Sequence, residues 1–206
     1  MLSFSAPCTR IHAAIGFRRS NGRHGTVHMT PRRGTSLITR CVDLPELGAI
    51  TSEDREYMQQ AINLAKTAAG KTHPNPIVGA VIVKDGDVVG MGYHPKAGQP
   101  HAEVFALRAA GDRAEGATAY VSLEPCNHFG RTPPCSQALV KAKVSRVVIG
   151  MVDPDPRVSG GGLHTCKNAG MEVAIIGGAE EEACKQMNED FIARVLAAKE
   201  AQESQS

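Results

Sequence analysis

Two cysteines and a histidine, in separate parts of the chain, have the types and surroundings of metal ligands. Cys126 and Cys135 bound the polar, proline-rich run Cys-Asn-His-Phe-Gly-Arg-Thr-Pro-Pro-Cys, and His101-Ala-Glu103 precedes them. One imidazole and two thiolates would leave a fourth tetrahedral position of zinc open for water, as in catalytic rather than structural sites. Zinc lowers the pKa of such a water from 15.7 to about 7. We therefore predict a catalytic zinc site.

The same residues match the general pattern of the zinc nucleobase deaminases, which have a histidine, a nearby glutamate that is not a ligand, and a Pro-Cys followed by a second cysteine. Glu103 would then take the proton from the water, protonate the ring nitrogen and hand a proton to departing ammonia. A single buried cysteine is more often a small hydrophobic residue. Cys166 and Cys184, which have no companion ligand nearby, are accordingly predicted to lie in the core.

The elements that must position these residues can be read from caps, turns and periodicity. Thr51 and Asp54 form a capping-box pattern before apolar residues at helical spacing, which predicts a helix over 53–69. Two β-branched runs, 78–84 and 87–93, flank Asp85-Gly86 and predict a hairpin. Glycines inside these strands mark a bulge or the close approach of a ligand or another backbone.

Helices and strands alternate along the remainder. We predict helices over 101–110, 135–142, 163–169 and 180–199, strands over 117–123, 144–152 and 171–176, and a loop over 124–134. The near-continuous apolar run 144–152 is typical of a strand covered on both faces. The order predicts an α/β fold, with helices covering a largely parallel sheet that has an antiparallel edge.

Charge divides the chain into two parts. Residues 1–42 hold seven arginines and no acid, whereas the remainder carries 16 basic and 21 acidic residues. The basic part is rich in serine and threonine and lacks the apolar core of a secretory signal, so we predict a disordered organelle transit peptide over about 1–45. Its composition favours a plastid over a mitochondrion, and an RNA-binding arm is the alternative. A globular domain over 50–198 and a tail over 199–206 complete the predicted organisation.

Composition excludes several classes of protein. The longest apolar runs are far shorter than the roughly 20 residues that span a bilayer, so no membrane partner is expected. Aromatic residues make up 4% and the body is acidic, which argues against a nucleic-acid partner. Without a secretory signal, a disulfide framework is not expected.

Five longer runs resemble the deaminase domain of the riboflavin-biosynthesis deaminase/reductase family. The resemblance covers roughly residues 53–195 and includes the eight residues between the two cysteines, where most related deaminases have two. The runs are 72–86, 94–98, 100–104, 116–135 and 150–154. The resemblance implies a cytidine deaminase-like three-layer α/β/α sandwich. It also implies hydrolytic removal of the 2-amino group of 2,5-diamino-6-ribosylamino-4(3H)-pyrimidinone 5′-phosphate, giving the 5-amino-uracil nucleotide and ammonia.

The resemblance also implies roles for individual residues. The family's zinc ligands fall on His101, Cys126 and Cys135, and its proton shuttle falls on Glu103. Substrate contacts fall on four further residues, which are Asn75, His94, His128 and Arg131. Asn75 could alternatively shape a proline-rich turn. Arg131 could alternatively be a solvated charge.

The chain departs from the family at two points. Asp155 stands where the family usually has asparagine, which leaves its role open. The family continues into a reductase domain, so no reductase activity is expected from this chain. Two alternatives remain, a deaminase of tRNA or a free nucleobase and a catalytically silent zinc scaffold. By analogy with the superfamily we expect a homo-oligomer, either a dimer or a tetramer.

Overall fold

The structure, a computed structural model, describes residues 47–130, 133–155 and 159–204. The predicted transit peptide therefore lies outside the described residues, as does Arg131. Within the described residues, no helix is long and apolar enough to cross a membrane.

A five-stranded mixed sheet forms the middle layer, in the order β2-β1-β3-β4-β5. Its strands are β1 (Gly79–Lys84), β2 (Asp87–Tyr93), β3 (Thr118–Val121), β4 (Arg146–Ile149) and β5 (Glu172–Ile175). β1 pairs antiparallel with both β2 and β3, whereas β4 pairs parallel with β3 and β5. Only β1 therefore runs against the other four strands. The predicted mixed, largely parallel sheet is confirmed, although the reversed strand lies inside the sheet rather than at its edge.

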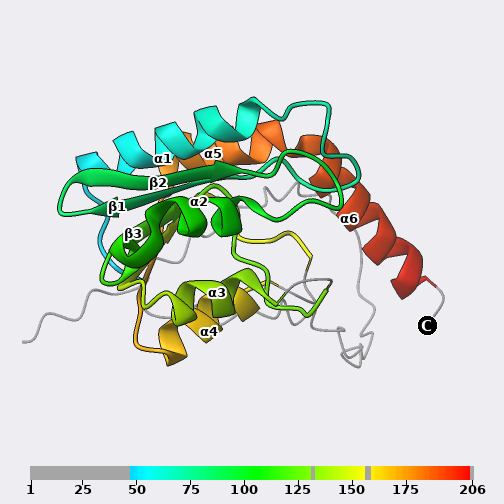
Figure 1. Cartoon of the computed structure of the whole chain (residues 1–206). Coiled ribbons are helices and arrows are strands. Elements are labelled where there is room, and N and C mark those ends of the chain that lie inside the picture. The colour runs from blue at the N-terminus through cyan, green and yellow to red at the C-terminus, as the bar shows by residue number, and fades with distance from the viewer. Residues whose placement is uncertain (1–46, 131–132, 156–158, 205–206) are drawn as a thin grey trace, which may run out of the picture. The chain divides into compact units, whose positions relative to one another are not determined.

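Helices cover both faces of this sheet. On one face lie α1 (Ser52–Lys66) and α5 (Gly178–Met187), and on the other lie α2 (Ala102–Ala110), α3 (Cys135–Lys141) and α4 (Gly161–Asn168) (Figure 1). A 3-10 turn, Gly111–Ala114, follows α2. β4 lies between the two layers, and Val147, Val148 and Ile149 are fully buried, as the apolar run predicts. The α/β/α prediction is confirmed.

The start of α1 and the hairpin turn follow their local signals. The Thr51 hydroxyl accepts a hydrogen bond from the Asp54 amide, and the Asp54 carboxylate accepts one from the Thr51 amide, so the capping box forms. Asp85 and Gly86 both have positive φ, 51° and 84°, as a two-residue hairpin turn of type I′ requires.

The strand glycines mark the close approach of helix backbones to the sheet. A Cβ on Gly79 would collide with the carbonyl oxygen of Ala61 in α1. A Cβ on Gly92 would collide with the carbonyl oxygen of Ala102 at the start of α2. The absence of side chains here lets α2 lie close against β2, which fixes the position of the residues at the helix start.

The prediction of one continuous helix over 180–199 is wrong. Two helices, α5 and α6 (Glu189–Glu203), meet at Asn188, whose φ of −114° departs from helical values. The side chain of Asn188 forms hydrogen bonds with the backbone of Ile77, which lies 111 positions earlier in the sequence. The helix is interrupted at the residue that makes this contact. α6 continues past the predicted end at Lys199 and diverges from the layer of α1 and α5 (Figure 1).

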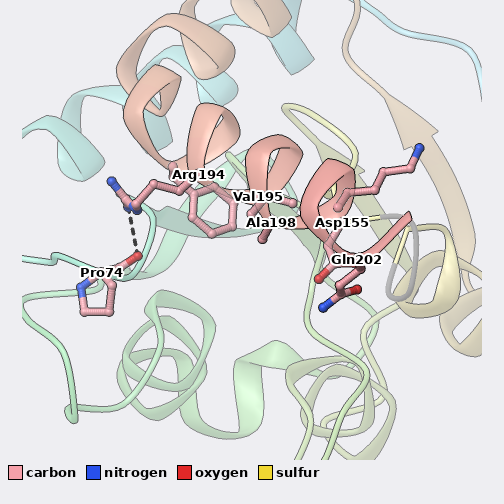
Figure 2. A pocket seen from close by; sticks show the side chains of 8 residues that line it. Pro74, Asp155, Arg194, Val195, Ala198 and Gln202 are labelled. Atoms are coloured by element: carbon pink, nitrogen blue, oxygen red, sulfur yellow. Dashed lines mark hydrogen bonds between the residues drawn. The ribbon is translucent and has the colours of Figure 1, made fainter. Parts of the chain in front are cut away.

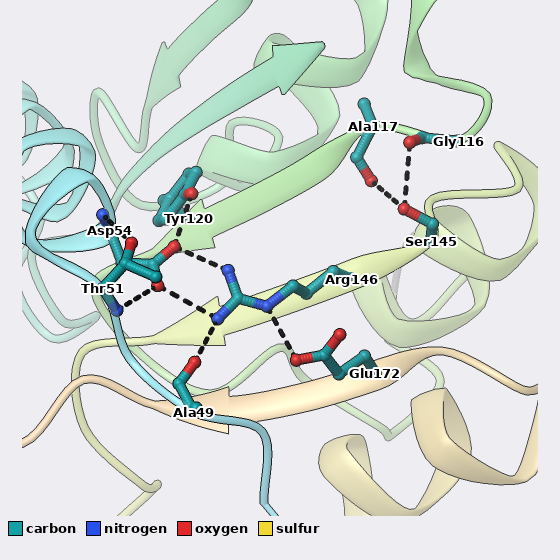
Figure 3. A network of polar contacts seen from close by, with 9 residues as sticks. All are labelled: Ala49, Thr51, Asp54, Gly116, Ala117, Tyr120, Ser145, Arg146 and Glu172. Atoms are coloured by element: carbon teal, nitrogen blue, oxygen red, sulfur yellow. Dashed lines mark hydrogen bonds and ion pairs between the residues drawn. The ribbon is translucent and has the colours of Figure 1, made fainter. Parts of the chain in front are cut away.

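A polar network centred on the buried Asp54 joins α1 to the sheet at the edge opposite β2 (Figure 3). Arg146 of β4 donates two hydrogen bonds to Asp54, at 2.6 and 3.1 Å, and one to Glu172 of β5 at 3.0 Å. The Tyr120 hydroxyl of β3 donates to Asp54 at 2.8 Å. Burial raises the pKa of the Asp54 carboxyl, but hydrogen bonds from Arg146, Thr51 and Tyr120 outweigh it and hold that pKa well below its usual range.

Candidate metal centre and substrate cavity

The three predicted metal ligands converge from separate elements. His101 is the N-cap of α2, Cys126 lies in the loop after β3, and Cys135 is the first residue of α3. The Nδ1 atom of His101 lies 3.5 Å from the Sγ atom of Cys126 and 3.4 Å from that of Cys135. All three ligand atoms fall within 4.8 Å of one another. A single ion between them could contact all three atoms.

The local electrostatics favour a thiolate at this point. The first turns of α2 and α3 begin beside the sulfurs, and helix N-termini stabilise negative charge. The backbone amide of Cys135 donates to the Cys126 sulfur at 3.3 Å. Hydrogen bonding with Cys135 lowers the pKa of the Cys126 thiol to about 4, whereas the same contact raises the pKa of Cys135. This contact favours a thiolate at Cys126, and binding of a divalent cation would favour ionisation of the second thiol as well.

Glu103 occupies the first turn of α2, two residues after His101. Its side chain is 3% exposed, and Oε2 is a buried oxygen without a hydrogen-bond partner among the described residues. Burial raises the pKa of Glu103 to about 7. A buried carboxyl group that can gain or lose a proton near neutral pH is suited to general acid–base chemistry.

His94 and Asn75 form a hydrogen-bonded pair beside His101. The Nδ1 atom of His94 lies 3.0 Å from the carbonyl oxygen of Pro100, which can only accept, so Nδ1 carries the proton. The bare Nε2 atom then accepts a hydrogen bond from the Asn75 side-chain amide, also at 3.0 Å. Burial lowers the pKa of His94, which keeps the ring neutral and maintains this pattern. The side-chain oxygen of Asn75 is the atom left for a ligand.

A cavity of about 280 Å³ brings most of these groups together. Glu103, His94, Asn75, His101 and Cys126 line it, and apolar side chains form part of the wall. The apolar contributors are Pro76, Val78, Leu123, Phe191 and Val195. The lining suits a small ligand with an apolar ring and a polar edge.

The remaining predicted site residues have different outcomes. The exposed His128 lies at the cavity, and so does Asp155. Arg131 is not among the described residues. Cys166 and Cys184 are fully buried, as predicted for core residues, and burial raises the pKa of each to about 12.

Sequence reasoning missed Glu124, which holds the loop that carries Cys126. Its carboxylate is 4% exposed and accepts hydrogen bonds from the backbone amides of Asp153, Gly160 and Gly162, at 3.0 to 3.2 Å. The ligand loop is thereby attached to the segment after β4 and to the start of α4. The position of Glu124 before Pro-Cys is the one local signal, but its partners lie 29 to 38 positions further along the chain.

Asn127, the neighbour of Cys126, makes a second attachment that the sequence did not reveal. Its Oδ1 atom accepts hydrogen bonds at 2.9 Å from the hydroxyls of Ser136, next to Cys135, and of Thr165 in α4. The two cysteines are therefore joined through side chains as well as through the loop.

Comparison with known proteins assigns this architecture. Residues 51–151 match the family model for the cytidine and deoxycytidylate deaminase zinc-binding region. The diaminohydroxyphosphoribosylamino-pyrimidine deaminase of Buchnera aphidicola (from Acyrthosiphon pisum) is 49% identical over 139 residues, which are 68% of this chain and 93% of that protein. The chain belongs to this deaminase family.

Two of the other similar proteins are longer than the chain, and a third is matched over its whole length. The chloroplastic riboflavin biosynthesis protein PYRD of Arabidopsis thaliana is 65% identical over 147 residues, covering 71% of this chain and 34% of that protein. The chain thus spans about a third of its length. Among solved structures, RibD of Acinetobacter baumannii aligns with a TM-score of 0.67 at 57% identity, covering 69% of this chain and 40% of that one. The Rib2 deaminase of Aspergillus oryzae, solved in complex with DARIPP, aligns at 0.55 and 25% identity, covering 73% and 100%.

Proposed function

We propose that this chain is a zinc-dependent deaminase of riboflavin biosynthesis. Its substrate would be 2,5-diamino-6-ribosylamino-4(3H)-pyrimidinone 5′-phosphate. Water replaces the 2-amino group, giving 5-amino-6-ribosylaminouracil 5′-phosphate and ammonia. The observation that carries this proposal is the buried carboxyl of Glu103 beside three convergent ligand atoms, because a purely structural metal site has no need of such a group.

His101, Cys126 and Cys135 are the residues that would hold zinc. Their donor set of one imidazole and two thiolates fits zinc and leaves one tetrahedral position for a fourth ligand. Zinc bound there would supply an activated water molecule at neutral pH. The unpartnered Oε2 atom of Glu103 supports the fit, because it is a buried acceptor that such a water could satisfy.

Glu103 performs the proton transfers in this proposal. The carboxylate takes a proton from the attacking water and delivers it to the adjacent ring nitrogen. It then transfers the second proton of the water to the amino group, which departs as ammonia while the ring carbonyl forms. The pKa of about 7 suits both directions, since the group must accept and release a proton within one turnover.

Asn75 and His128 would position the substrate. His94 fixes the amide of Asn75 so that its oxygen accepts a hydrogen bond from a donor on the pyrimidine. His128, at the exposed side of the cavity, and Arg131 are proposed to contact the ribose 5′-phosphate. Asp155 lies at the same cavity, and as a carboxylate it would favour a hydroxyl donor over the phosphate.

Ammonia release in a sample whose zinc content is measured tests the function. Purified protein with about one zinc per chain should deaminate the diamino-pyrimidinone nucleotide, and a Glu103→Gln variant with equal zinc should not. Turnover of cytidine, adenosine or tRNA in place of this nucleotide would favour the nucleic-acid or free-base alternative. Bound zinc with no turnover of any of these substrates would favour the scaffold.

We also propose a plastid location. The relatives from Arabidopsis thaliana and Zea mays are named chloroplastic, and residues 1–42 have the acid-free, arginine-rich composition of a transit peptide. Import of the radiolabelled chain into isolated chloroplasts with removal of its N-terminal segment would support this location, whereas import into mitochondria alone would refute it. That the chain forms a homo-oligomer, and that its domain spans residues 50–198, remain predictions.

A further inference from the structure

The C-terminal helix α6 reaches the substrate cavity from outside the segment that matches the family model. That segment ends at residue 151, yet Phe191 and Val195 of α6 line the same cavity as Glu103. Residues 72–77, which include Asn75, lie in the connection between α1 and β1 and contact α6. This packing joins parts of the chain that lie over 110 positions apart.

Asn188, at the junction of α5 and α6, is bound to the end of the Asn75 segment. Its side chain is 3% exposed, and its Oδ1 atom accepts a hydrogen bond from the Ile77 amide at 2.7 Å. Its Nδ2 atom donates to the Ile77 carbonyl at 3.0 Å and to the Cys184 carbonyl at 3.2 Å. One side chain therefore satisfies both backbone groups of Ile77, as a neighbouring strand would.

Arg194 of α6 makes a second contact on the other side of Asn75. Its guanidinium donates to the carbonyl oxygen of Pro74 at 3.0 Å (Figure 2). Asn75 thus lies between Pro74 and Ile77, whose backbones are bound by Arg194 and Asn188 respectively. Its own backbone amide donates to Thr72 at 2.8 Å, and its side chain donates to His94.

We propose that Asn188 is a positioning residue for the substrate and that Arg194 assists it. Asn188 fixes Ile77 and Arg194 fixes Pro74, so the side chain of Asn75 is presented to the cavity in one orientation. Neither residue touches the reacting atoms. The proposal rests on the proposed function, because it assumes that Asn75 binds the pyrimidine.

Substitution of Asn188 by aspartate gives the first test. Asn188→Asp keeps the acceptor for the Ile77 amide but loses both donated hydrogen bonds. We expect KM for the nucleotide to rise about tenfold with kcat nearly unchanged, by analogy with groups that orient metal ligands, whose mutation typically costs about 10–100-fold. Zinc content should equal that of the wild type, because the metal ligands are untouched.

Matched controls separate positioning from stability. Val173→Ala, at a buried position of β5, should lower the melting temperature without changing KM. Arg194→Gln, at an exposed residue, should raise KM about threefold, whereas Arg113→Gln, at another exposed arginine, should not. The expected factor for Arg194 is smaller since one hydrogen bond to a charged donor is lost at the surface.

A double variant and hydrogen exchange decide the outcome. If Asn188 acts through Asn75, the pair Asn75→Ala with Asn188→Asp should raise KM no further than Asn75→Ala alone. Additive effects, or an unchanged KM in Asn188→Asp and Arg194→Gln, would refute the inference. If the wild type did not turn over the nucleotide, the proposed function would fail. Whether Asn188 holds the Asn75 segment would still be decided by amide exchange, because Asn188→Asp should speed exchange of the Asn75 amide and an unchanged rate would refute it.

Discussion

Replacing Asp54 by asparagine should cost this fold about 3 kcal/mol. The Asp54 side chain is 3% exposed, and that of Arg146, its partner, is 16% exposed. Removing one member of a buried ion pair typically costs 3–5 kcal/mol, because the other charge stays buried without its partner. Arg146 retains Glu172 at 3.0 Å and the Ala49 carbonyl at 2.7 Å, so we expect a loss of about 3 kcal/mol, the lower end of that range.

Thermal and urea unfolding of the zinc-loaded protein would measure this loss. About 3 kcal/mol corresponds to a fall in melting temperature of roughly 6–12 °C for a domain of this size. Arg146→Met should destabilise by a similar amount, whereas the double variant should lose about 2 kcal/mol less than the sum, since neither charge is then left alone. Activity at 25 °C should be retained, because neither Asp54 nor Arg146 lines the cavity.

The same pair sets a pH dependence of stability. The folded-state pKa of Asp54 lies below the unfolded value of about 3.9, so its contribution is present above pH 4 and is lost as pH falls through the folded pKa. The stability difference between wild type and Asp54→Asn should therefore be full at pH 7 and shrink below about pH 4. A loss under 1 kcal/mol at pH 7, or additive single variants, would refute the reasoning.

Four further variants test other contacts. Glu103→Gln should lower kcat by about 10²–10⁴ with zinc retained, and a similar loss of zinc would show a structural role instead. Cys135→Ser should lower zinc affinity in a competition titration with a chelator, and equal affinity would remove Cys135 from the ligand set. Gly92→Ala should destabilise by about 1–3 kcal/mol in urea, because its Cβ would collide with the Ala102 carbonyl, and a neutral result would mean that α2 can shift. Glu124→Gln should cost about 1–3 kcal/mol in the same assay, because its amide would face backbone N–H groups, and unchanged stability would contradict this.

The parts of the fold that follow short-range rules could be predicted from the sequence. Thr51 with Asp54 indicated the start of α1, and Asp85-Gly86 indicated the hairpin, because these signals operate within a few residues. The convergence of His101 with the two cysteines was predictable for another reason. Ligand chemistry restricts which residue types can form such a set, so their joint presence is informative even at long separation.

The outer wall of the cavity could not be predicted in this way. Phe191 and Val195 have ordinary apolar spacing for a helix, and nothing local distinguishes a wall of a cavity from a core. The break at Asn188 is caused by a partner, Ile77, that lies 111 positions earlier. The role of Glu124 could not be predicted either, because its three partners are backbone amides. Every residue except proline has a backbone amide, so the sequence does not show which ones Glu124 contacts.

The three hydrogen bonds of Glu124 bear on how this fold can vary. The chain leaves its carboxylate at Asp153 and returns to it at Gly160, so both ends of the intervening segment are fixed to one side chain. Doubling the length of such a loop costs only about 0.6 kcal/mol in closure entropy. Insertions after Asp155, which lines the cavity, would therefore change the surroundings of the ligand while Cys126 keeps its place, so this is a suitable point for altering substrate choice by design.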